Sequence, residues 1–143
     1  MLKVMLVDDE TAVLSGLESL FPWEDRGLCI VAKARNGQEA IEKYKTFNPD
    51  IVITDICMNV KDGLSFLMEV KSINANTQVI ILTGYPDFEY AKKAVNNGAF
   101  AYLLKPISMT ELEKVIEKVK AHIYKKNMIV FQQFLYEILN MDK

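Results

Sequence analysis

The chain alternates five short apolar, β-branched runs with stretches whose apolar residues repeat at the period of an α-helix. Near-continuous apolar strands separated by helices predict a parallel sheet that is covered on both sides. We therefore expect an α/β fold, a doubly wound five-stranded parallel sheet with helices on both faces. The expected strands are Lys3–Val7, Cys29–Lys33, Asp50–Thr54, Gln78–Leu82 and Phe100–Leu104.

The stretches between these runs predict helices over Thr11–Leu20, Gly37–Phe47, Gly63–Ile73, Pro86–Asn97 and Ser108–Ile123. Pro86 suits a first helical position, and Ser108 with Glu111 fits a capping box. Spacing of three and four residues predicts one apolar face on each helix. The predicted faces are Val13, Leu14, Leu17 and Leu20; Ala40, Ile41, Tyr44 and Phe47; Leu64, Leu67, Met68 and Lys71; Phe88, Ala91 and Val95; and Leu112, Val115, Ile116 and Val119.

The composition excludes several classes of protein. A net charge of −2 in 143 residues offers no basic stripe for nucleic acid, and no segment is apolar enough to span a membrane. The amino terminus lacks the pattern of a secretion signal. Cys29 and Cys57 match no metal spacing and are too few for a disulfide framework, so we expect reduced thiols and a cytoplasmic protein.

The last residues have a different character from the rest of the chain. We assign 1–124 to one domain and 125–143 to a linker or helical tail. Met128, Phe131, Leu135 and Ile138 follow one another at steps of three and four, which predicts an amphipathic helix. This helix either extends the fifth helix and pairs with a second chain as a coiled coil, or folds back on its own domain or frays.

Polar side chains follow the strands where they end. Asp8 and Asp9 follow the first strand, Asp55 the third, Thr83 the fourth and Lys105 the fifth. Strands joined by right-handed crossovers end at one edge, and a strand order of 2-1-3-4-5 reverses direction between the first and third strands. Three carboxylates there suit Mg²⁺, and a lysine and a hydroxyl suit a phosphoryl group. An aspartate can itself take a phosphoryl group.

Simpler interpretations exist for each of these residues alone. Asp8 and Asp9 are acceptable N-caps of the first helix, Asp62-Gly63 is an ordinary turn signal, and Lys105 suits a solvated loop. These interpretations require all the polar residues to fall at the ends of the correct strands by coincidence. We therefore favour a phosphoryl-transfer site.

Three fragments in this order resemble the receiver domain of two-component response regulators. They are "LVDDE", "DIVITDICMNVKDG" and "ILTGYPDFEYAKKAVNNGAFAYLLKP", and the resemblance runs from Lys3 to about Ile123. It implies a flavodoxin-like sheet and phosphorylation by a sensor histidine kinase. The segments "PWEDRGLCIVAKARNGQEA" and "TGYPDFEYAKKA" resemble regulators with an AraC-type DNA-binding half, which is absent from this sequence.

The resemblance carries roles onto four residues near the metal. Asp55 corresponds to the phosphoacceptor and Asp9 to the direct Mg²⁺ ligand, while Asp8 binds through water or orients the site. The backbone carbonyl of Cys57 completes the ligands, so the implied metal set is Asp8, Asp9, Asp55 and Cys57. Asn59 stands where the family mostly has proline, and Cys57 is uncommon at its position.

Further roles fall on the other strand ends. Thr83 and Lys105 correspond to the hydroxyl and the lysine that hold the phosphoryl group, and Lys105-Pro106 to a cis bond. Tyr102 corresponds to an aromatic switch residue. With Cys57, Tyr85 lies where side chains govern water access, so we expect both to tune the lifetime of the acyl phosphate.

The expected function is a phosphorylatable switch that controls an output domain through the face of the fourth helix, fifth strand and fifth helix. The expected output is transcriptional. It catalyses its own phosphotransfer and slow autodephosphorylation and is no conventional enzyme. A homodimer through that face or the tail is an open prediction, with no membrane and no nucleic acid bound by this fragment.

One alternative is an adaptor that binds partners without phosphorylation. A phosphohydrolase of the haloacid-dehalogenase type has its acidic motifs in a different order.

Overall fold

The computed structural model describes residues 1–58, 61–84 and 88–141, and only the backbone of Phe88. The predictions on Asn59, Tyr85, Pro86 and the side chain of Phe88 therefore lie outside the described residues. The chain divides into two compact units, Met1–Met109 and Thr110–Lys143, each of which is described by itself.

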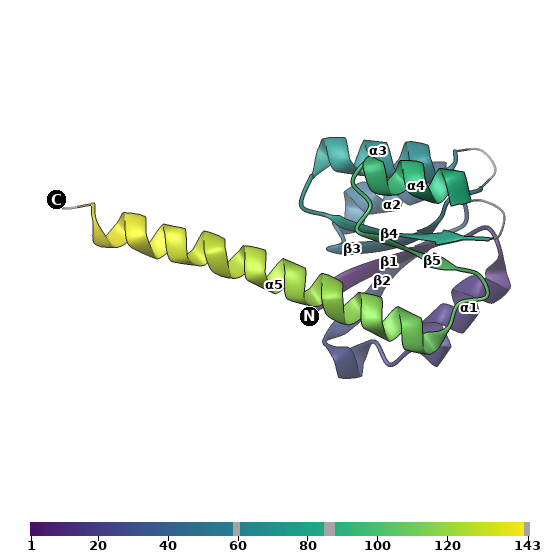
Figure 1. Cartoon of the computed structure of the whole chain (residues 1–143), viewed down its shortest axis with the longest axis horizontal. Helices are drawn as coiled ribbons and strands as arrows, with labels where there is room; N and C mark the ends of the chain where they lie inside the picture. Colours follow the sequence, from purple (N-terminus) through teal and green to yellow (C-terminus); the bar gives the residue numbers. More distant parts are fainter. Residues whose placement is uncertain (59–60, 85–87, 142–143) are drawn as a thin grey trace. The chain divides into compact units, whose positions relative to one another are not determined.

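The first unit contains a single parallel sheet in the order β2-β1-β3-β4-β5 (Figure 1). This result confirms the predicted doubly wound α/β fold. Each predicted strand is present, and no end differs from its prediction by more than one residue. The strands are β1 (Leu2–Val7), β2 (Leu28–Ala34), β3 (Ile51–Asp55), β4 (Gln78–Thr83) and β5 (Ala101–Leu104).

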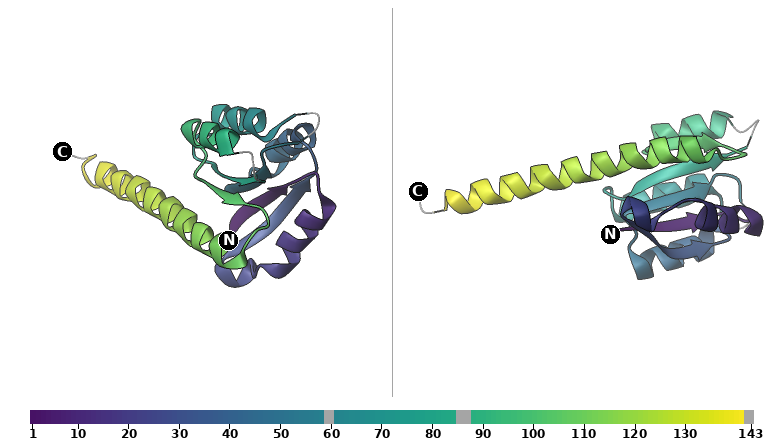
Figure 2. Two further views of the ribbon diagram at one scale, coloured as in Figure 1. Left: turned by 45° about the vertical axis from the view of Figure 1, so that its right-hand side comes forward. Right: turned by 90° about the horizontal axis from the view of Figure 1, so that it is seen from below.

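Helices lie on both faces of this sheet, as Figures 1 and 2 show: α2, α3 and α4 on one side, and α1 on the other. Their bounds are α1 (Thr11–Leu20), α2 (Gly37–Phe47), α3 (Gly63–Ile73) and α4 (Phe88–Asn96), with a short 3₁₀ helix, η1 (Glu24–Arg26), before β2. Alternate residues of the central strands pack against α2, α3 and α4. This core includes Met5, Val7, Val52, Val79, Ile81, Ala40, Tyr44, Phe66, Leu67, Val70 and Ala94.

The predicted helix faces are correct in period but wrong at some positions. Four residues that were expected in the core are exposed instead: Leu20 at 68%, Phe47 at 41%, Met68 at 53% and Val95 at 42%. Leu20 and Phe47 are the last residues of their helices. In α3 the buried face includes Phe66 and Val70, so the face is rotated relative to the prediction.

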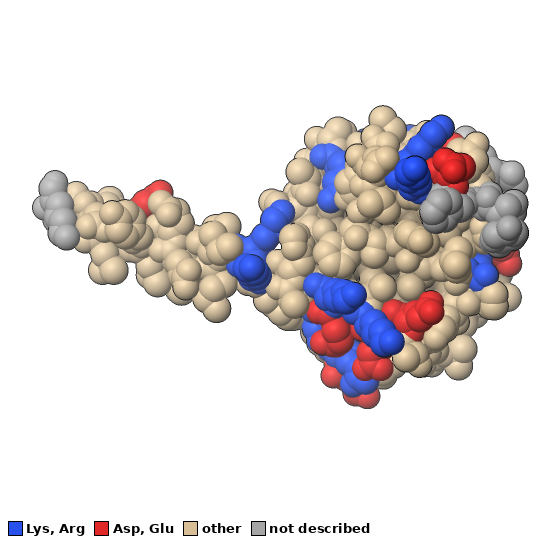
Figure 3. All heavy atoms as spheres, in the orientation of Figure 1, with Lys and Arg blue, Asp and Glu red and all other residues tan. Residues whose placement is uncertain are grey.

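The second unit consists mainly of α5 (Met109–Leu139), which begins directly after the predicted capping residue Ser108. Leu112, Ile116 and Val119 are fully buried, as predicted. The helix continues past Ile123 without a break, so the tail extends the fifth helix. Its later half carries few charges in the view of Figure 3. The assignment of 125–143 to a linker stays a prediction.

No helix of the described residues is long and apolar enough to cross a membrane.

Candidate functional site

The polar residues at the strand ends meet at the carboxyl edge of the sheet. Asp8 directly follows β1, Asp55 is the last residue of β3, and Thr83 is the last residue of β4. Register pairing places Asp55 beside Leu82, one residue before Thr83. Lys105 directly follows β5, and its backbone N–H donates to the carbonyl of Thr83 at 2.8 Å.

The Lys105 ammonium gathers three carboxylates around one nitrogen. Its Nζ lies 2.8 Å from Asp8 Oδ2, 3.3 Å from Asp55 Oδ2 and 3.3 Å from Glu10 Oε1. Residues 50 and 95 positions apart in the chain are thereby brought together. Sequence reasoning predicted that Lys105 lies beside Asp8, Asp9 and Asp55 at this edge of the sheet. It missed the contact with Glu10, because nothing in the sequence separates a contacting glutamate from an exposed residue at the start of a helix. The Lys105-Pro106 bond is cis, as the resemblance implied.

Asp8 is fully buried and does not cap a helix. Its Oδ1 accepts a hydrogen bond from Glu10 N at 2.9 Å, while the N-cap of α1 is Glu10 and has no side-chain capping bond. The Asp8 Oδ2 forms an ion pair with Lys105 Nζ at 2.8 Å. A buried carboxylate is costly unless it is paired with a cation, and here Lys105 provides that pairing.

The electrostatics of the cluster oppose full ionisation of the aspartates. Burial, followed by the nearby charge of Asp8, raises the pKa of Asp55 from 3.8 to about 6, although Lys105 acts in the opposite direction. Burial also raises the pKa of Asp8. For Lys105, burial alone lowers the pKa, but the hydrogen bond and charges of the two aspartates outweigh it and the net pKa is raised.

Residues at the two ends of the loop after β3 lie close to Asp55. The backbone N–H of Gly63 donates to Ile56 O at 2.8 Å, and the N–H of Cys57 donates to Asp55 Oδ1 at 3.3 Å. A Cβ built on Gly63 would lie 2.2 Å from the carbonyl oxygen of Asp55. The position therefore requires glycine, although Asp62-Gly63 looked in the sequence like an ordinary turn.

The acidic residues fit a hard divalent cation. Carboxylate oxygens of Asp8, Asp9 and Glu10 lie within 4.8 Å of one another. Asp9 also borders a hollow of about 290 Å³ together with Cys57 and Met58, so it lies near the loop whose carbonyl was predicted as a ligand. This set of carboxylates offers the all-oxygen ligands that Mg²⁺ prefers.

Thr83 and Tyr102 differ in exposure. Thr83 is fully buried at the end of β4, and its hydroxyl donates to the carbonyl of Gly84 at 3.3 Å. Tyr102 lies in β5 opposite Ile81, and 39% of it is exposed. The tyrosine therefore faces solvent in this state rather than packing into the core.

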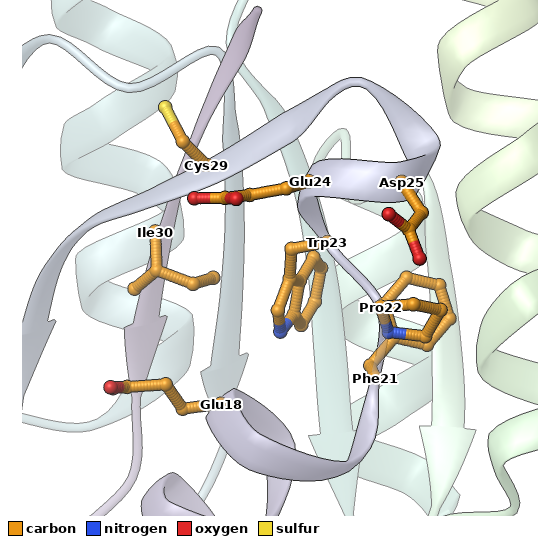
Figure 4. A pocket seen from close by; sticks show the side chains of 8 residues that line it. All are labelled: Glu18, Phe21, Pro22, Trp23, Glu24, Asp25, Cys29 and Ile30. Carbon is orange, nitrogen blue, oxygen red and sulfur yellow. The ribbon is translucent and has the colours of Figure 1, made fainter.

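A separate hollow of about 420 Å³ lies at the other end of the sheet, away from these residues. Figure 4 shows the Trp23 indole among its lining side chains, with Glu24 and Cys29 nearby. The indole N–H donates to Leu17 O at 2.9 Å, and Leu28 N, at the start of β2, donates to Trp23 O. Trp23 therefore lies away from the carboxyl edge of the sheet.

Comparison with known proteins places this architecture in a family. The family model described as "Response regulator receiver domain" matches residues 4–117. The chain belongs to the response regulator receiver domain family, and its sheet has the flavodoxin-like order of that family. The predicted resemblance to receivers is confirmed.

Relatives and solved structures agree with this assignment. The chain is 38% identical over 128 residues to the uncharacterized transcriptional regulatory protein YesN of Bacillus subtilis (strain 168), covering 90% of this chain and 35% of YesN. It is 31% identical, with a TM-score of 0.84, to the REC domain of the response regulator AraT from Geobacillus stearothermophilus, covering 88% and 98% of the two chains. A two component transcriptional regulator AraC from Clostridium phytofermentans ISDg gives 26% identity, a TM-score of 0.81, and coverage of 87% and 97%.

The chain spans about a third to a half of the length of the curated relatives it matches. Those relatives include transcriptional regulators, so the similarity to regulators of transcription is confirmed for the receiver portion.

Proposed function

We propose that this receiver domain is a switch that accepts a phosphoryl group on Asp55. The observation that carries the proposal is the cluster in which the Asp55 carboxylate lies against Lys105 and beside Asp8 at the carboxyl edge of the sheet. A nucleophilic carboxylate, a fixed cation and a neighbouring acidic group are the parts that phosphoryl transfer needs.

The chain's own residues supply most of the chemistry. A carboxylate oxygen of Asp55 forms a bond to phosphorus as the bond from phosphorus to the donor's histidine nitrogen breaks, and the electron pair of that bond stays on the nitrogen. Lys105 is already paired with Asp55 and can pair with an oxygen of the transferred group. The hydroxyl of Thr83 can donate to a second oxygen.

Mg²⁺ is the proposed cofactor. Asp8, Asp9, Asp55 and the backbone carbonyl of Cys57 would hold it, with Glu10 close enough to contribute. The ion would neutralise the charge of the incoming phosphoryl group, which three carboxylates would otherwise repel.

A sensor histidine kinase is the proposed donor, and the surface beside the cluster offers it a place to dock. A hollow of about 470 Å³ runs along α1 and is lined by Val13, Leu17, Leu20, Pro106 and Ile107. Lys105 and Glu10 border the same hollow, so a partner seated there would hold its phosphohistidine close to Asp55. The 68% exposure of Leu20, which contradicted the core prediction, fits a residue that contacts a partner.

This docking surface has a direct test. Leu20→Glu should slow phosphorylation by a phosphorylated histidine kinase while leaving phosphorylation by acetyl phosphate unchanged. Ser19→Glu, on the same helix and outside the hollow, is the matched control. Equal rates of transfer from the kinase to the wild-type chain and to Leu20→Glu would contradict the docking surface.

The output side of the switch is proposed to be the α4-β5-α5 face. Within the first unit, α4 and β5 expose the apolar side chains of Tyr90, Val95, Tyr102 and Leu104. Phosphorylation adds about −1.5 to −2 charge at the edge of the sheet, and Thr83 and Tyr102 would respond by moving between two pre-existing states. The controlled output is proposed to be transcriptional, in a part of the protein outside this sequence.

Several other expectations remain part of the proposal. The chain turns over no separate substrate but catalyses its own phosphorylation and slow dephosphorylation, and this fragment itself binds no nucleic acid. A cytoplasmic location stays a prediction, as does tuning of the lifetime of the acyl phosphate by Cys57 and Tyr85.

An adaptor that binds partners without phosphorylation is the second candidate. An adaptor has no need of the acidic pair, the acceptor or the lysine. Here these groups are present and in contact around one nitrogen, which favours the phosphorylated switch.

The main experiment is phosphorylation by acetyl phosphate with Mg²⁺. The wild-type chain should gain one acid-labile phosphoryl group by intact mass, and Asp55→Asn should gain none. Asp25→Asn, an exposed aspartate on η1, is the matched control and should react like the wild type. Labelling of Asp55→Asn to the wild-type stoichiometry would remove Asp55 from its role, and absence of labelling in the wild type would favour the adaptor.

A further inference from the structure

The later half of α5 exposes an unusual amount of apolar surface. Every residue from Tyr124 to Leu139 is exposed, and Glu137 is the only charged residue from 127 to 141. Figure 3 shows the corresponding lack of charge on the visible face. The large apolar residues here are each at least 40% exposed: Tyr124, Met128, Ile129, Val130, Phe131, Phe134, Leu135, Tyr136, Ile138, Leu139 and Met141.

Such a helix is not expected to be stable alone. Helical propensity contributes little to stability, and most helices in proteins depend on packing of one face, which residues 124–139 of α5 lack here. The segment is also rich in β-branched and aromatic residues such as Ile129, Val130 and Phe134, which favour helix less than alanine or leucine does. The helical state of 124–139 therefore points to a partner that covers it.

The apolar residues form a continuous seam. Tyr124, Met128, Phe131, Leu135 and Ile138 alternate steps of four and three, which is the a/d pattern of a coiled coil. On the opposite side, Lys126, Gln133 and Asn140 recur at steps of seven and are all polar. The strip directly opposite the seam is therefore polar, although the apolar residues Ile129, Val130 and Tyr136 also lie outside the seam.

We propose that residues 124–141 pair with the same segment of a second copy of this chain, as a parallel, in-register coiled coil. The pairing goes beyond the proposed phosphorylation and does not depend on it. The argument for a second copy rests on the positions that flank the seam, because these positions choose the partner and its direction.

In a parallel pair, each residue just before Met128 or Leu135 in the seam meets the residue five positions later in the partner, on the other flank of the seam. Phe134 then meets the partner's Leu139, which is apolar against apolar. Asn127 meets the partner's Gln132, so two amides meet and can hydrogen-bond. The segment is therefore complementary to itself in this direction.

An antiparallel pair would be poorly matched. With Met128 opposite the partner's Ile138, Asn127 would face the partner's Met141, and Lys125 would face the partner's Leu139. These two contacts at the ends of the pair set a polar or charged side chain against an apolar one, which costs free energy when the groups are desolvated, whereas Gln132 and Phe134 would each meet their own copy. The parallel direction is therefore favoured.

The exposed area is sufficient for a dimer. The exposed fractions of the seam and of Phe134 and Met141 amount to an area on the order of 600 Å² per helix, given about 150–250 Å² for a whole aromatic side chain. Stable interfaces bury about 800 Å² per partner. The helix alone supplies most of that area.

The test is the molar mass of the 143-residue chain by sedimentation equilibrium, in wild type and in two lysine variants. We expect wild type to have twice the monomer mass of 16.3 kDa. Phe131→Lys, in the seam, should weaken association roughly 30-fold or more, as expected for loss of a central aromatic anchor. Gln133→Lys is the matched control, two residues away in the polar strip opposite the seam, and should remain dimeric.

Direction is tested by crosslinking in a Cys29→Ser, Cys57→Ser background. Ile138→Cys should form a disulfide between copies, because a parallel register brings identical positions together, whereas Gln133→Cys should not. A dimer in which Ile138→Cys does not crosslink would overturn the parallel register.

Independence from phosphorylation is tested with Asp55→Asn, which should dimerise like the wild type. A wild-type chain that is monomeric at about 100 µM, which corresponds to a binding free energy weaker than about −5.5 kcal/mol, would overturn the proposal. A dimer that remains intact in Phe131→Lys would also overturn it. A chain that is monomeric in solution and binds anionic lipid vesicles through α5 would overturn it as well. None of these outcomes bears on labelling of Asp55, so the two proposals fail separately.

Discussion

Replacing Asp55 by asparagine should stabilise the metal-free protein, and the gain should depend on pH. The folded pKa of Asp55 is about 6, against 3.8 for an ordinary aspartate, so the native state binds this proton more tightly than the unfolded chain does. The wild-type free energy of unfolding therefore falls as pH rises from about 4 to about 6. At about 1.4 kcal/mol for each pKa unit, the cost of the buried charge at pH 8 is about 3 kcal/mol.

Asparagine has nearly the same shape and carries no charge, so Asp55→Asn should recover most of that free energy at pH 8 and very little near pH 4. The assay is urea unfolding in EDTA, followed by the fluorescence of Trp23, which is 5% exposed in the folded protein. Asp25→Asn controls for the loss of an exposed charge. A gain that is the same at both pH values, or a loss of stability at pH 8, would refute the electrostatic account of the cluster.

Three further changes test the local structure of the first unit. Gly63→Ala should destabilise the fold by about 3 kcal/mol, since its Cβ would meet the Asp55 carbonyl at 2.2 Å; a urea curve like that of wild type would contradict the close approach. Lys105→Met should cost about 3 kcal/mol in EDTA at pH 8 because it leaves two buried aspartates without their cation, and added Mg²⁺ should restore part of it. Tyr44→Phe should cost about 1–2 kcal/mol in the same assay, because the Thr77 hydroxyl loses its 2.6 Å partner.

Much of the fold was predictable because each strand and helix has a local pattern in the sequence. Strands that are buried on both faces appear in the sequence as apolar runs, and the helices between them appear as stretches with helical periodicity. All five strands were therefore predicted to within one residue at each end. The meeting of Asp8, Asp55 and Lys105 followed from topology, since parallel strands with crossover connections end at one edge.

The misses have physical reasons. Periodicity gives the spacing of a helical face but not its orientation, so Met68 was assigned to the core although Phe66 and Val70 occupy it. The need for glycine at position 63 comes from a carbonyl eight residues earlier, and the contact of Glu10 with Lys105 spans 95 residues. Neither relation leaves a local pattern in the sequence.

The account as a whole depends on Asp55 being the group that takes phosphorus in a site that needs a divalent cation. The most direct measurement is peptide mapping of the chain after reaction with acetyl phosphate, in Mg²⁺ and in EDTA. The account predicts one modified residue, Asp55, in Mg²⁺ and no modification in EDTA. Modification at another residue, or equal modification of Asp55 without the metal, would contradict it.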